Sequence, residues 1–230
     1  MSAPLAVFDV DGTLVDSREA IQAAMTRGFG GAGLSPPPYA DTRRIVGLSL
    51  PEALRTLAPA LDAAALDRVA DAYRTAWRDM HADPGFHEPL YPGAADLLEH
   101  LSAAGWRLAM ATGKSRRGVE TIVRMHHWED VFASTHCADD GPGKPHPAML
   151  EAALAAAGAR PRDAVMIGDT AFDMHMARAA GVRAVGVTWG FHTAREVEAG
   201  GADHISSDFA DLRAELGRFA ASKRGATAPI

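Results

Sequence analysis

Lysine and cysteine are scarce in this chain of 230 residues. The single cysteine, Cys137, excludes a disulfide within the chain and argues against a cysteine-based metal site. The 23 basic residues include lysine only at Lys114, Lys144 and Lys223, and all the others are arginine. Each lysine is therefore an exception in an arginine-rich sequence, and its position needs a specific explanation.

An excess of positive charge and long apolar runs are also absent. The formal net charge is −6, which does not predict a broad basic surface, so nucleic acid is not an expected partner. No segment approaches the roughly 20 apolar residues of a membrane span. The opening residues, MSAPLAVFDV, lack the basic and long apolar regions of a secretion signal. We expect no membrane partner and a cytoplasmic location.

What is present is an alternation of short apolar runs and amphipathic segments. The length suits one large domain, or one domain with a smaller insertion. Apolar runs, which we predict to be strands, span 5–10, 107–112, 164–169 and 184–189. Amphipathic segments, predicted to be helices, span 94–104, 116–127, 147–157 and 171–180. This order predicts an α/β fold with a doubly wound parallel sheet.

Residues 17–90 interrupt that alternation. Helical patterns occupy 17–28, 50–58 and 62–82, and the stretch contains no convincing strand. The segment Tyr-Pro-Gly at 91–93 marks the return to the alternating pattern. We therefore predict an all-helical insertion at 17–90 within a core formed by residues 1–16 and 91–230.

Three of the predicted strands end in a polar residue, namely Asp9, Thr112 or Asp169. In an open parallel sheet the carboxyl ends of the strands line the ligand crevice, so these side chains are expected to converge. Lys144 lies in the loop GPGKPHP, after the candidate strand FASTHC. The sequence thus predicts one site built from residues far apart along the chain.

The segment DVDGT, at 9–13, carries the sharpest chemical signal. Asp9 and Asp11 are two residues apart and can face the same way at a strand end. Close carboxylates repel one another unless a cation or a shared proton intervenes, and oxygen-rich acidic clusters suit Mg²⁺. Asp169 adds a third acid, with Asp173 behind it. A Mg²⁺ site is therefore predicted at this edge of the sheet.

Such a site suits phosphoryl transfer. Asp9 would attack phosphorus as the nucleophile. Asp11 would protonate the leaving oxygen and then take a proton from the attacking water. Thr112 and Lys144 would hold the phosphate oxygens.

These segments resemble the motifs of the haloacid dehalogenase-like superfamily of hydrolases. FDVDGTLVDS is similar to the first motif, ATGKS to the second, the Lys144-Pro145 loop to the third and GDTAFD to the fourth. They occur in the family's order and span most of the chain. A single motif would be weak support, whereas four in order are specific.

The resemblance implies a Rossmann-like core with a mobile helical cap at 17–90. It also implies that Mg²⁺ is held by Asp9, the main-chain carbonyl of Asp11, and Asp169, with Asp173 acting through water. The second motif adds Gly113 to the phosphate-binding residues.

The resemblance also separates branches of the superfamily. The dehalogenases and the phosphonate-cleaving enzymes lack the second aspartate of the first motif, whereas Asp11 is present here. The phosphoglycolate phosphatase-like branch is the most similar, through DGTLVDS, IVGLSLPEAL and the YPG return. The expected partner is a small phosphorylated metabolite, with phosphoglycolate as the candidate. Arg44 is the candidate for pairing with its carboxylate.

Two other functions share parts of this pattern. A phosphosugar mutase uses all of the same catalytic motifs, and the sequence alone does not separate it from a phosphatase. A signalling receiver domain also uses a phosphorylated Asp with a Thr and a Lys. The helical insertion, the DVDGT pair and the length argue against a receiver.

Overall fold

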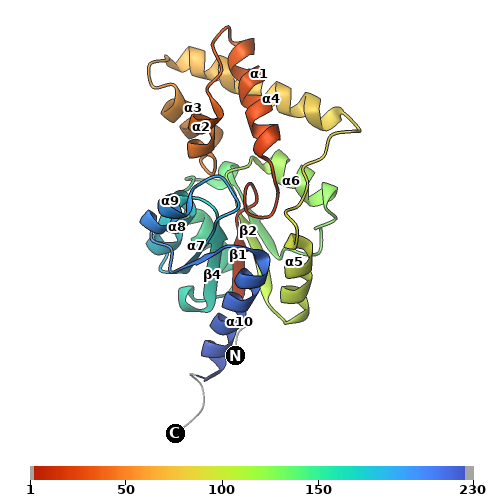
Figure 1. The fold of residues 1–230 in the computed structure, drawn as a ribbon, viewed down its shortest axis with the longest axis vertical. Coiled ribbons are helices and arrows are strands. Elements are labelled where there is room, and N and C mark those ends of the chain that lie inside the picture. Colours follow the sequence, from red (N-terminus) through yellow and green to blue (C-terminus); the bar gives the residue numbers. More distant parts are fainter. Residues whose placement is uncertain (1–2, 226–230) are drawn as a thin grey trace.

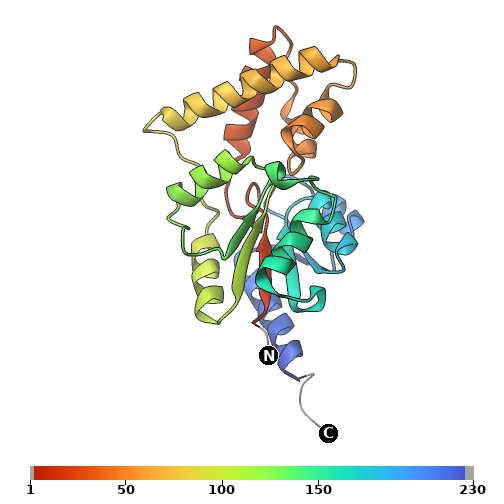
Figure 2. The same ribbon diagram turned by 180° about the vertical axis from the view of Figure 1, so that it is seen from behind.

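A computed structural model describes residues 3–225 of the chain (Figure 1, Figure 2). An α/β body carries a second, all-helical body at one end of its sheet. The sheet has six parallel strands in the order β3-β2-β1-β4-β5-β6. The strands are β1 (Leu5–Phe8), β2 (Arg107–Ala111), β3 (Ser134–His136), β4 (Ala164–Gly168), β5 (Arg183–Val187) and β6 (His204–Ser206). The doubly wound parallel sheet predicted from the sequence is confirmed.

The apolar runs are continuous because both faces of the sheet are covered by helices. In β1, Ala6 and Phe8 belong to one buried cluster, while Leu5 and Val7 belong to another on the opposite face. Helices α5 (Ala94–Ala103), α6 (Arg116–Met125) and α10 (Phe209–Gly225) pack on the first face. Helices α7 (Ala148–Ala157), α8 (Ala171–Ala179) and α9 (Ala194–Ala199) pack on the second.

The helical body is formed by the segment between β1 and α5 (Figure 1). It contains α1 (Arg18–Gly31), α2 (Tyr39–Thr42), α3 (Leu50–Leu57) and α4 (Ala63–Ala82). These helices have their own apolar cluster, which includes Met25, Leu54 and Val69. The Asp62 side chain accepts a hydrogen bond from the Ala65 amide at 2.8 Å and so defines the start of α4.

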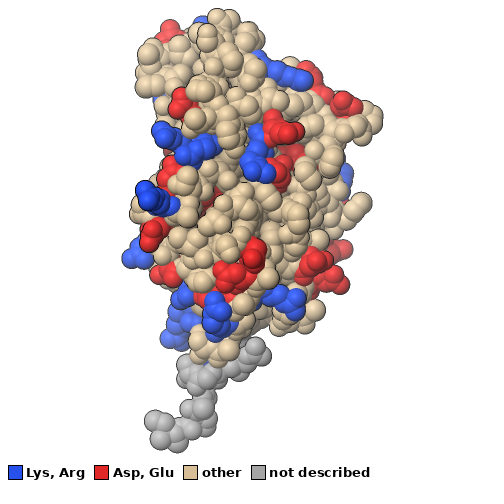
Figure 3. Space-filling view, viewed as in Figure 1, with Lys and Arg blue, Asp and Glu red and all other residues tan. Residues whose placement is uncertain are grey.

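Acidic and basic side chains are interspersed over the face shown in Figure 3, without a broad region of one sign. The described residues contain no helix that is long and apolar enough to cross a membrane. The sequence did not predict the short helix α2 in the helical body. It also did not predict α9, the short strand β6 and α10 near the C-terminus.

Leu101 provides a test of the packing between α5 and the sheet. It is 2% exposed within the core cluster. Leu101→Ala should lower the free energy of unfolding by about 2–5 kcal/mol, because it leaves a cavity in a closely packed interior. Glu99→Ala, on the exposed side of the same helix, should stay within about 0.5 kcal/mol of the wild type. Urea denaturation followed by circular dichroism measures both, and equal stabilities would contradict the packing described.

Candidate active site

Three polar residues that follow neighbouring strands form the floor of the site. Asp9 follows β1, Thr112 follows β2 and Asp169 follows β4. The order of the strands is β2-β1-β4, and Phe8 of β1 is paired with Met110 and with Ile167. The three residues therefore emerge side by side at the carboxyl edge of the sheet, although up to 160 positions separate them in sequence (169 − 9).

A buried cluster of three carboxylates occupies this edge. Asp9, Asp169 and Asp173 each offer an oxygen, and these oxygens all lie within 4.8 Å of one another. Asp173 comes from the first turn of α8, where it also accepts hydrogen bonds from the main-chain N–H and the hydroxyl of Thr170. All three carboxylates are at most 1% exposed.

Burial and mutual repulsion disfavour the ionised state of this cluster. Burial raises the pKa of Asp9 to about 7; Lys144 opposes this shift, whereas the charge of Asp173 adds to it. Burial also raises the pKa of Asp169 well above its usual value, together with the charges of Asp9 and Asp173. The negative charge of the cluster therefore needs more compensating positive charge than its surroundings provide.

Lys144 supplies the positive charge that contacts this cluster directly. Its side chain is fully buried, with Nζ 2.8 Å from Asp9 Oδ1 and 2.7 Å from Asp173 Oδ1. Burial alone would lower the pKa of Lys144, but the Asp173 and Asp9 carboxylates raise it above its usual value. The side chain is therefore an ammonium, and a compact ammonium fits between two carboxylates better than a planar guanidinium.

The donor set fits a divalent cation. Asp9 Oδ2 is buried and has no hydrogen-bond partner among the described residues. Asp169 is held in place by the Thr13 hydroxyl, which donates to Oδ1 at 2.8 Å, and by the Phe191 amide, which donates to Oδ2 at 2.7 Å. Several oriented carboxylate oxygens with a surplus of negative charge are the surroundings that Mg²⁺ prefers.

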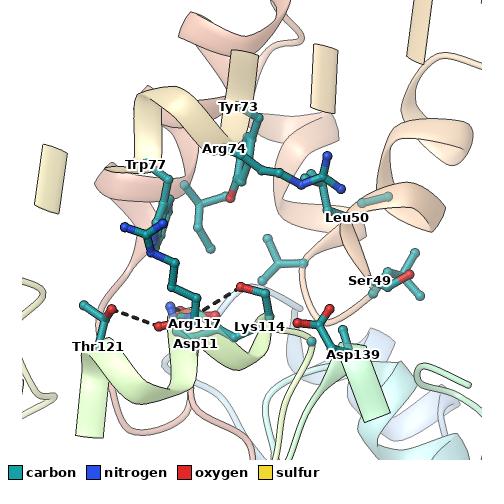
Figure 4. Close-up of a pocket in the computed structure, with 18 of the residues that line it drawn as sticks. Asp11, Ser49, Leu50, Tyr73, Arg74, Trp77, Lys114, Arg117, Thr121 and Asp139 are labelled. Atoms are coloured by element: carbon teal, nitrogen blue, oxygen red, sulfur yellow. Dashed lines mark hydrogen bonds and ion pairs between the residues drawn. The ribbon is translucent and has the colours of Figure 1, made fainter. Parts of the chain in front are cut away.

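A cavity of about 940 Å³ lies between the helical body and the core (Figure 4). The core contributes Asp9, Asp11, Gly113 and Lys114, and the helical body contributes residues of α1, α3 and α4. Tyr73 and Trp77 extend from α4 toward the core, while Arg117 rises from α6 (Figure 4). The cavity therefore connects the acidic cluster with a mixed aromatic and cationic wall.

The phosphate-binding candidates occupy different positions around this cavity. Thr112 is buried, and its hydroxyl oxygen accepts a hydrogen bond from the Lys114 amide at 3.3 Å. Gly113 lines the cavity and packs against the helical body, because a Cβ there would lie only 2.7 Å from the carbonyl oxygen of Gly47. Lys144 contacts Asp9 directly.

Arg44 lies away from this group. It is exposed and does not line the cavity. Its neighbour Arg43 donates to the carbonyl oxygen of Phe191 and forms an ion pair with Glu196. The structure thus brings together the motif residues but does not bring Arg44 to them.

Sequence reasoning missed two residues beside Lys114, whose ammonium contacts Asp11. Glu88 is 1% exposed and lies 3.6 Å from Lys114 Nζ, and the ring of Trp77 lies beneath that ammonium. Neither residue belongs to a recognisable motif. The scarcity of lysine was the one available signal for this group, since it drew attention to Lys114.

Known proteins are similar to this chain in sequence and in fold over most of its length. A family model described as haloacid dehalogenase-like hydrolase matches residues 6–187. A hydrolase of known structure from Pseudomonas syringae is 25% identical, with a TM-score of 0.83 over 94% of this chain and 98% of that one. The chain therefore belongs to the haloacid dehalogenase-like hydrolases.

Curated relatives narrow the class to phosphatases. A phosphoglycolate phosphatase from Agrobacterium fabrum is 31% identical over 98% of this chain and 97% of its own length. One from Pseudomonas putida is 32% identical over 92% of this chain and 78% of its own length. The chain is a phosphatase of this family, in the branch that resembles phosphoglycolate phosphatases.

Gly12 tests the close packing around Asp169. Its φ is +82°, and a Cβ would collide with the Asp169 carboxylate and lie 2.6 Å from the Phe191 ring. Gly12→Ala should abolish phosphatase activity because it displaces Asp169. Gly33→Ala is the matched control, since Gly33 also has a positive φ, +75°, but has nothing within 4 Å of its Cβ position.

Both variants should lose about 1–2 kcal/mol of stability from the left-handed backbone. Phosphate release from an aryl phosphate is measured on folded protein of both variants. Loss of activity in Gly12→Ala alone identifies the clash with Asp169, because the backbone strain is common to both variants. Activity retained by Gly12→Ala, or lost equally in both variants, would contradict this packing.

Proposed function

We propose that this phosphatase hydrolyses a small phosphate monoester through an aspartyl-phosphate on Asp9, with Mg²⁺ as its cofactor. The observation that carries the proposal is the buried contact between Asp9 and Lys144 beside Asp169 and Asp173. A nucleophilic carboxylate, a fixed ammonium and a cation-binding acid cluster are the groups that phosphoryl transfer needs.

The chemistry takes two displacements at phosphorus. In the first, an Asp9 oxygen forms a bond to phosphorus while the ester oxygen leaves and takes a proton from Asp11. In the second, water attacks the phosphorus, Asp11 takes a proton from that water, and the bond to Asp9 breaks. The products are an alcohol and inorganic phosphate, and both aspartates return to their starting states.

Four residues would hold the cation: Asp9, Asp11 through its main-chain carbonyl, Asp169, and Asp173 through water. When bound, Mg²⁺ would offset the repulsion between these carboxylates and the phosphate of the substrate. Thr112, Gly113 and Lys144 would hold the oxygens of the transferring phosphoryl group.

We also propose that residues 17–90 act as a mobile cap that selects the substrate. Support comes from the residues that line the cavity. Asp9 and Asp11 at its base belong to the core, and its outer wall is largely provided by α3 and α4. A cavity enclosed in this way suits a small molecule better than a protein or nucleic acid.

Phosphoglycolate is the candidate substrate. It is the substrate named for relatives that are 31% and 32% identical. A structure named as a beta-phosphoglucomutase from Bacteroides vulgatus is also similar, but at 17% identity this similarity concerns the fold alone. Hydrolysis is therefore proposed in preference to the mutase reaction.

Phosphate release from small esters, with Mg²⁺ and after exhaustive chelation by EDTA, tests the proposed chemistry. EDTA should abolish activity and Mg²⁺ should restore it. Asp9→Asn should remove activity while the fold is kept, because size is preserved but the nucleophile is lost. Asp67→Asn, on the exposed face of α4, is the control.

Phosphate release by a folded Asp9→Asn protein would contradict the assignment of the nucleophile. Full activity after chelation would contradict the role of the metal. Isomerisation of a phosphosugar without phosphate release would favour the mutase.

Recognition of the substrate's carboxylate is tested by comparing phosphoglycolate with hydroxyethyl phosphate, which has a hydroxymethyl group in place of the carboxylate. The kcat/KM for phosphoglycolate should be higher by about 10-fold or more, the effect of one charge-assisted hydrogen bond. Arg117→Ala should reduce this ratio, because the guanidinium of Arg117 belongs to a residue that lines the cavity.

Arg44→Ala is the matched comparison. Because Arg44 is exposed outside the cavity, we expect it to leave the ratio unchanged. A reduced ratio in Arg44→Ala alone would show that Arg44 recognises the carboxylate. Equal kcat/KM values for the two esters in the wild type would exclude recognition of the carboxylate.

A further inference from the structure

A second buried lysine, Lys114, lies beside Asp11. Its Nζ is 2.9 Å from Asp11 Oδ1, 3.6 Å from Glu88 Oε1 and 4.8 Å from the centre of the Trp77 ring. The side chain is only 6% exposed. Three different groups therefore restrain one ammonium, and one of them is the proposed acid–base residue.

The restraint on Lys114 comes from the helical body and from the segment that returns from it. Glu88 lies between α4 and α5, and its Oε2 is 3.1 Å from His81 Nε2. The other ring nitrogen of His81 is 2.9 Å from the carbonyl oxygen of Trp77, one turn earlier in α4. The chain of contacts thus runs from α4 through Glu88 and Lys114 to Asp11.

This group is costly for the fold to maintain. Placing Glu88 and Lys114 out of contact with water carries a desolvation penalty, and apolar side chains of similar size would often be no less stable. Neither residue takes part in the bond-making steps described above. Their contact with Asp11 is the feature that connects them to the chemistry.

The direction of the hydrogen bond to Asp11 has a chemical consequence. An ammonium can only donate, so Asp11 Oδ1 must accept whether the carboxyl group is ionised or protonated. The proton of a neutral Asp11 therefore favours Oδ2, because a carbonyl oxygen accepts from an ammonium more strongly than a hydroxyl oxygen does. Oδ1 itself is buried, whereas Asp11 lines the cavity and its side chain is 12% exposed, so the accessible side is the one that carries Oδ2.

We infer that Lys114 is a positioning residue for Asp11, and that Glu88 and the α4 residues Trp77 and His81 hold Lys114 in place. Lys114 occupies Oδ1 and thereby directs the transferable proton of Asp11, on Oδ2, toward the leaving oxygen. Because Trp77 and His81 belong to α4, the acid–base group is correctly set only while the helical body is seated on the core. This inference rests on the proposed role of Asp11.

Leaving groups of different basicity provide the test. An alkyl ester such as hydroxyethyl phosphate needs a proton on its leaving oxygen, whereas p-nitrophenyl phosphate releases a stable anion without one. The measurement is the rate constant for phosphorylation of the enzyme by each ester in single turnovers, by rapid quench with enzyme in excess. The rate constant for the alkyl ester divided by that for the aryl ester reports proton delivery to the leaving oxygen. A general loss of active protein lowers both rate constants and leaves this ratio unchanged.

Lys114→Met and Glu88→Gln should each reduce this ratio by about 10-fold or more, a part of the 10²–10⁴-fold that acid–base catalysis contributes. Asp11→Asn should reduce it further, and adding Lys114→Met to Asp11→Asn should change it no more, since both act through one proton. Glu215→Gln is the matched control. Glu215 is a buried glutamate of α10 that pairs with Arg183 of β5 and Arg218 of α10, remote from the site. Its substitution should leave the ratio unchanged.

Equal losses for both esters in Lys114→Met and Glu88→Gln, beside a selective loss in Asp11→Asn, would overturn the inference and make the pair purely structural. A higher KM with an unchanged ratio would overturn it in favour of direct substrate binding by Lys114. If Asp11→Asn itself shows no selective loss, the proposed acid–base role fails, and this inference fails with it. Retention of phosphorylation in Asp9→Asn would instead identify a failure of the nucleophile assignment.

Discussion

Repulsion among buried carboxylates is the interaction to which the rest of this structure is adapted. Asp9, Asp169 and Asp173 meet at one edge of the sheet with almost no exposure to water. Such a group is unfavourable by itself, as the raised pKa values of Asp9 and Asp169 reflect. A fold that retains it must provide compensating positive charge and rigid donors, and here it provides Lys144, the Thr13 hydroxyl and main-chain amides. The same surplus of negative charge suits the site to a cation.

The two buried lysines divide the site between them. Lys144 lies between Asp9 and Asp173, within the acid cluster. Lys114 lies between Asp11 and Glu88, on the side that faces the helical body. Both are compact ammonium groups in a chain whose other cations are almost all arginine. An ammonium can donate to two carboxylates in a confined space, which the planar fork of arginine does less well.

The helical body and the core make different contributions to the cavity. The core supplies Asp9 and Asp11, the carboxylates to which the proposed mechanism assigns the chemistry at phosphorus. The helical body supplies Tyr73, Trp77 and Arg74, which line the outer part of the cavity. Through Glu88, the connection between the two bodies also reaches Asp11. In the proposed mechanism, substrate selection and proton transfer both depend on one placement of the helices over the sheet.

The sequence alone determined the fold class and the motif residues, because both leave local signals. Continuous apolar runs mark strands covered on both faces, and Asp9 and Asp169 follow directly from the ends of such runs. The short strand β6 has one strongly apolar residue and left no such signal. Tertiary structure decided that Glu88 meets Lys114 and that Arg44 lies outside the cavity. These outcomes depend on how helices pack over the sheet, and contacts between residues far apart in the chain leave no periodic pattern from which they can be read.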